Sequence, residues 1–199
     1  MIEIAAGLVT KYLVRREVVN QDEKDVYKYG FEILFSTILG ICIVLILGLT
    51  AGSLMTSLIF IAVFCSLRIK CGGYHADSYL SCNVVFTTVF LIVLMVEKFS
   101  EKVLISPPVL VMVYLLGFIV MHMYAPVENV NKPLDMEEKK KGRKESHILY
   151  ALWSVIGFVL YTYNYSAMVA LTATVLMVII LMLAGVAKER KFKYAEKGK

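Results

Sequence analysis

The chain has 199 residues, of which 59% are hydrophobic and only 19% are charged. A soluble domain of this length cannot bury so much apolar surface, so lipid is the expected solvent. The formal net charge of +5 does not indicate a nucleic-acid-binding protein, because the basic residues flank apolar runs and form no patch interleaved with aromatic residues.

Residues 1–30 carry charges of both signs and have no early uncharged core followed by a cleavage site, so we expect no signal peptide. Apolar residues recur there at helical spacing, close to basic residues: Ala5, Leu8, Val9, Tyr12 and Leu13. This pattern predicts an amphipathic helix that lies in the cytoplasmic membrane interface. A solvated amphipathic helix packed on the loops is the alternative.

Residues 33–187 are predicted to form about six transmembrane helices, so the expected fold class is all-α and polytopic. As one helix, the charge-free run 33–67 would be about 50 Å long, whereas the hydrocarbon core is about 30 Å thick. The sequence G-L-T-A-G-S at 48–53 divides this run, and T-Y-N-Y-S at 162–166 divides the last one. The expected spans are 33–49, 53–67, 82–96, 109–126, 148–163 and 166–187.

The distribution of Lys and Arg predicts that both termini are cytoplasmic. With six spans, the termini share one side with the loops at 68–81 and 127–147, and this side holds 19 of the 21 basic residues. Since such loops are cytoplasmic by the positive-inside rule, we expect a multi-pass cell-membrane protein with a basic cytoplasmic tail at 188–199. We expect one membrane domain over residues 1–199.

The loop at 127–147 ends in a charged segment. Asp135 is expected to cap a helix, with Glu138 three residues further on. A basic cluster follows, and it indicates attraction either to anionic lipid headgroups or to an acidic peptide. Its members are Lys139, Lys140, Lys141, Arg143 and Lys144.

The segment R-I-K-C-G-G-Y-H-A-D-S-Y-L-S-C at 68–82 is a polar island between apolar runs. It is open to several interpretations, of which a simple interfacial turn is one. A metal site of Cys71, His75 and Cys82 is another, but the spacings of four and seven do not match common zinc sites, and we expect no metal or cofactor. A transporter is disfavoured because the spans hold few ionisable residues beyond His122 and His147.

A nucleophilic pair is the remaining interpretation of the island. Cys82 follows His75 by seven residues, which returns to the same face of an ideal helix. The imidazole would take the thiol proton, and the thiolate would attack a carbonyl carbon. Asp77 or Ser78 could orient the imidazole.

Other residues of the island would support such a pair. Gly72 and Gly73 give the backbone freedom just before the histidine, and their N–H groups could face an oxyanion. Arg68 could hold the loop or, together with Lys70, favour the thiolate. Cys71 has no assigned role.

The pattern R-x-x-x-G-G-Y-H-A-D-S-Y-x-x-C, from Arg68 to Cys82, closely resembles the signature of the AgrB (accessory gene regulator protein B) family of Gram-positive membrane endopeptidases. The resemblance extends over most of the chain and includes A-P-V-E-N-V-N-K-P-L at 125–134. It implies that His75 is the catalytic histidine and Cys82 the nucleophile. It also implies that Arg68 and Gly73 are needed for activity, and that Lys139–Lys141 handle the precursor.

The resemblance further implies the substrate, an AgrD-like quorum-sensing propeptide with an amphipathic N-terminal helix and an acidic C-terminal tail. The enzyme would remove the tail and keep the signal segment as a thioester, which can cyclise to an autoinducing peptide. The alternative is a non-enzymatic peptide carrier or signalling accessory with a structural Cys–His pair. A homodimer is a further expectation.

Overall fold

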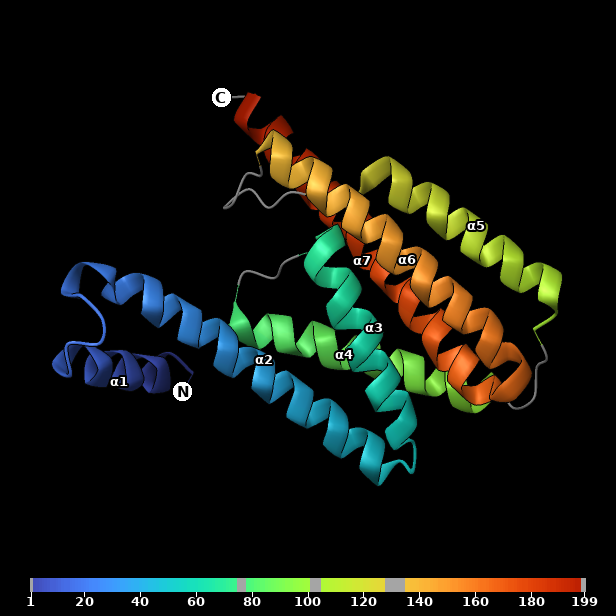
Figure 1. The fold of residues 1–199 in the computed structure, drawn as a ribbon, viewed down its shortest axis with the longest axis horizontal. Helices are drawn as coiled ribbons and strands as arrows, with labels where there is room; N and C mark the ends of the chain where they lie inside the picture. The colour runs from blue at the N-terminus through green and yellow to red at the C-terminus, as the bar shows by residue number, and fades with distance from the viewer. Residues whose placement is uncertain (1, 75–77, 101–104, 128–134, 198–199) are drawn as a thin grey trace. The chain divides into compact units, whose positions relative to one another are not determined.

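The computed structural model describes residues 2–74, 78–100, 105–127 and 135–197. These residues form seven α-helices and a short 3-10 helix at Gln21–Glu23, and this confirms the predicted all-α fold class (Figure 1). The α-helices are α1 (Ile2–Arg15), α2 (Lys24–Thr50), α3 (Leu54–Cys71), α4 (Tyr79–Ser100), α5 (Pro107–Tyr124), α6 (Met136–Tyr163) and α7 (Tyr165–Lys197).

Helices α2 to α7 are long and apolar enough to cross a membrane, which confirms the predicted six spans within the described part of the chain. Within the long charge-free runs, the helices end where the sequence predicted a break. Gly52 adopts φ +69°, a left-handed conformation that favours glycine, and the N–H of Ser53 donates to the Gly48 carbonyl at 2.7 Å. Asn164 separates α6 from α7. The interfacial position of α1 stays a prediction.

Helix α6 begins well before its expected span, because the predicted cap at Asp135 is present. The Asp135 carboxylate accepts the Glu138 N–H at 2.6 Å, and the Glu138 carboxylate accepts the Asp135 N–H at 3.2 Å. This reciprocal capping box starts the helix at Met136. Lys139, Lys140 and Lys141 therefore lie on the first turns of a helix.

The described residues fall into two compact units. Unit 1 consists of residues 1–47 and 76–88, and unit 2 of residues 48–75 and 89–199. Helices α2 and α4 therefore contribute residues to both units. The expectation of one membrane domain over residues 1–199 stays a prediction.

The core of unit 2 is built around α7, which packs against α3, α5 and α6. It is the most buried of the six apolar helices, with 61% of its most apolar window inside the protein. Glycines let two neighbours of α7, the helices α5 and α6, approach each other closely, as is usual between membrane helices. Tyr150 of α6 lies against Gly117 of α5 and donates from its hydroxyl to the Tyr114 carbonyl at 2.9 Å. Tyr114 in turn lies against Gly157 of α6.

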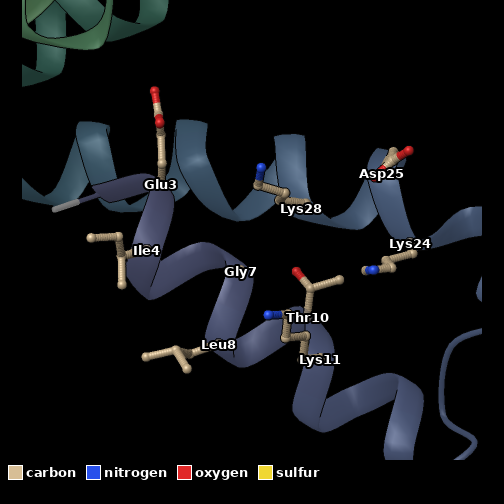
Figure 2. Close-up of a pocket in the computed structure, with 9 residues that line it drawn as sticks. All are labelled: Glu3, Ile4, Gly7, Leu8, Thr10, Lys11, Lys24, Asp25 and Lys28. Atoms are coloured by element: carbon tan, nitrogen blue, oxygen red, sulfur yellow. The ribbon is translucent and has the colours of Figure 1, made fainter.

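Unit 1 contains α1 and the first parts of α2 and α4. Two hydrogen bonds join α4 to α2: the Tyr79 hydroxyl donates to the Glu32 carboxylate, and the Asn83 amide donates to the Ser36 hydroxyl, both at 2.9 Å. A hollow of about 360 Å³ lies between α1 and α2. Its lining residues include Thr10 of α1 and Lys24 and Lys28 of α2 (Figure 2).

Candidate active site

The polar island begins in the last turn of α3, and two glycines follow the end of that helix. Gly72 has φ +68° and Gly73 has φ +127°. Residues that carry a side chain strongly disfavour both backbone conformations. The Gly72 N–H donates to the Arg68 carbonyl at 3.2 Å and so closes the helix. That amide is therefore engaged by the helix end, and the expected role of Gly72 and Gly73 in facing an oxyanion stays a prediction.

Arg68 clamps the segment that follows α3. Its guanidinium donates to the carbonyl oxygens of both Gly72 and Tyr74. A planar guanidinium carries several donors in a fixed arrangement, so one side chain can hold two carbonyls at once. Of the two roles considered for Arg68, holding the loop is the one that these bonds support.

The segment 125–127 lies beside the same loop. The Val127 N–H donates to the Cys71 carbonyl at 2.9 Å, and Gly72 and Val127 form a parallel backbone bridge. A side chain at Gly72 would collide with the Val127 backbone. The Arg143 Nε donates to the Ala125 carbonyl at 3.1 Å, which ties this segment to α6.

Helices α6 and α7 complete the surroundings of the loop. Lys70 and Glu145 form an ion pair with an N–O distance of 2.7 Å, which links the end of α3 to α6. On the other side, the Tyr74 N–H donates to the Leu181 carbonyl of α7 at 2.9 Å. The Lys188 ammonium lies 5.2 Å from the centroid of the Tyr74 ring. The end of α3, the segment after α5, the first turns of α6 and the second half of α7 thus contribute contacts to residues 70–74.

Cys82 lies in the first turn of α4, in unit 1, and is exposed. Its N–H donates to the Ser78 carbonyl at 3.0 Å. The Ser78 hydroxyl accepts the Ser81 N–H at 3.1 Å, as the side chain of an N-cap serine does. Ser78 therefore caps α4, and its predicted orientation of the imidazole stays a prediction.

His75 and Asp77 lie outside the described residues. Within the ranges that are described, no three His, Cys, Asp or Glu side chains gather closely enough to hold a metal ion. Cys71, the other thiol of the island, is completely buried. It is therefore inaccessible to a substrate, whereas the Cys82 thiol is accessible.

Unit 1 contains two hollows, of which the first is lined by no residue of the island and the second by Ser78, Tyr79 and Leu80 of it. Figure 2 shows the first one, between α1 and the start of α2, with charges of both signs around it. The second, of about 780 Å³, is lined by residues from α1, α2 and α4 and the adjoining Ser78, including Leu39, Tyr79 and Val84. Neither is lined by Cys82.

The comparison with protein families decides the family of the chain. The family model described as Accessory gene regulator B matches residues 6–183. The chain belongs to the AgrB family. It is 28% identical over 172 residues to AgrB-like protein 2 of Clostridium perfringens strain 13, covering 82% of this chain and 80% of the relative. An AgrB-like protein of C. perfringens strain SM101 is 26% identical over 192 residues, covering 92% and 88% of the two chains. No solved structure matches.

Membership of the AgrB family confirms the resemblance found in the sequence. It makes the protein a quorum-sensing processing protein with several membrane helices, and it implies a role in processing an AgrD-type propeptide. The sequence did not indicate that Leu181, Lys188 and Glu145 surround the island. A glycine inside the last apolar run, Gly185, is a local signal that could have pointed to a close backbone approach there.

Proposed function

We propose that this AgrB-family protein is a cysteine endopeptidase that removes the C-terminal tail of an AgrD-like propeptide through a thioester on Cys82. The observation that carries the proposal is the Arg68 clamp, which fixes the two carbonyls on either side of Gly73, immediately before His75 in the chain. A catalytic group needs a fixed position, and a displacement of about 1 Å can cost about 100-fold in rate. The clamp supplies such a position at the motif.

The reaction transfers one acyl group twice, first to Cys82 and then to a group of the peptide, and each transfer moves one proton. The His75 imidazole takes the proton of the Cys82 thiol, and the thiolate attacks the carbonyl carbon of the scissile peptide bond. The C–N bond then breaks, and the imidazolium returns the proton to the leaving amine of the tail. The signal segment stays on the sulfur as a thioester. A thiol or hydroxyl of the peptide then attacks the thioester carbonyl carbon, the bond from that carbon to the Cys82 sulfur breaks, and the proton of the attacking group passes through the His75 imidazole to the Cys82 thiolate.

The site would lie at the cytoplasmic face of the membrane. The loop after α3, the segment after α5, the first turns of α6 and the second half of α7 are held together at one end of unit 2. The positive-inside rule places such a basic end in the cytoplasm, together with both termini. A water-poor membrane boundary would protect the thioester until the ring closes.

The lysines at the start of α6 would receive the acidic tail of the propeptide. Lys140 and Lys141 are exposed, and Lys139 is half-buried. They stand within two turns of Glu145, which is paired with Lys70 beside the loop. Exposed lysines attract a carboxylate-rich peptide through charge, so they would raise the local concentration of substrate.

Co-expression with a propeptide from the same genome, followed by mass spectrometry, tests the proposal. We expect a released C-terminal tail and, after acid quenching, a protein mass increased by the N-terminal part of the peptide. Both signals should disappear in Cys82→Ala. Continued tail release by purified Cys82→Ala protein would rule out the mechanism.

A further inference from the structure

The loop of the island and the last helix meet through two glycines that face each other. Gly73 stands on the loop and Gly185 is buried on α7. A Cβ atom built on Gly185 would lie 2.5 Å from the Gly73 carbonyl carbon and 2.6 Å from the Tyr74 nitrogen. A Cβ atom on Gly73 would lie 3.0 Å from the Met182 Cα. The two backbones therefore touch with no side chain between them.

This approach allows the loop to bond to the helix backbone. The Tyr74 N–H donates to the Leu181 carbonyl at 2.9 Å. Leu181 stands four residues before Gly185, so the two are neighbours on one face of α7. A side chain at Gly185 would occupy the space through which the Tyr74 amide approaches that carbonyl.

We infer that Gly185 is a positioning residue of the proposed peptidase, which acts by letting α7 hold the backbone immediately before His75. The inference rests on the proposed function. An alanine at 185 would push Gly73 and Tyr74 away by about 1 Å, from 2.5 Å to an ordinary contact distance. Tyr74 is the residue to which His75 is bonded, so the displacement would affect the backbone that leads into His75.

The test compares Gly185→Ala with Gly30→Ala in membranes or nanodiscs. Gly30 is also inside a helix, and an added Cβ there meets nothing within 4 Å. Alanine is the better helix former, so an effect on helix propensity alone would stabilise both variants. We expect Gly185→Ala to lower the turnover of tail release about 10- to 100-fold, with KM within about twofold of the unsubstituted protein. Gly30→Ala should keep both values.

A second measurement separates positioning from a general loss of structure. The pH dependence of Cys82 alkylation should shift in Gly185→Ala toward that of His75→Ala, while the buried Cys71 stays protected from the reagent. Unchanged turnover in a Gly185→Ala protein with protected Cys71 would overturn the inference. The proposed function would still stand if Cys82→Ala were inactive in the same assay.

If Gly185→Ala exposes Cys71 and has therefore lost its fold, a second variant tests the inference. Lys188→Met leaves the α7 backbone unchanged and removes the ammonium that lies over the Tyr74 ring. A several-fold lower turnover with unchanged KM would support the hold of α7 on the loop. Turnover equal to that of the unsubstituted protein would overturn it.

Discussion

Arg68, in the last turn of α3, donates a hydrogen bond to the backbone carbonyl of Tyr74, six residues further along the chain. A second bond from the same guanidinium goes to the Gly72 carbonyl. One side chain thus spans the whole turn that leads into the histidine of the motif. The turn is therefore held by Arg68 of α3 and by the Leu181 carbonyl of α7.

Replacing Arg68 by lysine should therefore impair catalysis although the charge is kept. A lysine ammonium cannot reproduce the planar arrangement that reaches both carbonyls, and each charge-assisted hydrogen bond contributes about 1.5–3 kcal/mol. We expect the turnover of tail release to fall about 10- to 100-fold, measured by quantifying the released tail. Lys98→Met, which removes an exposed charge near the end of α4, is the control and should keep full activity. Normal turnover in Arg68→Lys would contradict the clamp.

The two thiols of the island should differ sharply in reactivity. Cys71 is completely buried and Cys82 is exposed, so a water-soluble maleimide should label Cys82 at least about tenfold faster in otherwise cysteine-free protein. Intact-mass spectrometry over time measures both rates. In the activity assay, Cys71→Ser should largely keep tail release and Cys82→Ser should abolish it. Equal labelling of the two thiols would show that the end of α3 is not packed as described.

The lysine run at the start of α6 should affect binding more than chemistry. Changing Lys139, Lys140 and Lys141 together to glutamine should raise KM for a propeptide with an acidic tail several-fold and leave turnover nearly unchanged, because lost charge attraction weakens encounter. The effect should shrink at high salt, where charges are screened. A substrate whose tail carboxylates are amidated is the matched control. If the triple substitution raises KM for the amidated substrate as much as for the acidic one, the lysines have another role.

The contact of Gly157 with Tyr114 should control the stability of unit 2. A Cβ atom at Gly157 would collide with the Tyr114 hydroxyl, which lies 2.9 Å from the Thr172 hydroxyl. We expect Gly157→Ala to cost about 1–3 kcal/mol, the usual range for overpacking, and to lower the melting temperature in detergent. Adding Tyr114→Phe removes the colliding oxygen and should restore part of the loss. A melting temperature that does not change in Gly157→Ala would contradict this packing.

The sequence predicted the spans well because their signals are local. Charge-free runs, the glycine-containing break around Gly52 and the cap at Asp135 each act within a few residues of where they stand. The start of α6 was harder to predict from the sequence, because a capped polar helix can continue directly into a span. The contacts of Lys70 with Glu145 and of Tyr74 with Leu181 join distant parts of the chain, and no local pattern encodes them. The island itself was found because its residue types are unusual between apolar runs.

The burial of α7 also has a consequence for the order of events during synthesis. This helix is the last part of the described chain to be translated, and it supplies the Leu181 carbonyl that holds the Tyr74 amide. His75 and Cys82 of the motif are translated about 100 residues before Leu181. The turn before His75 would lack its support from α7 at that stage, so the proposed peptidase would become active only after α7 has been made.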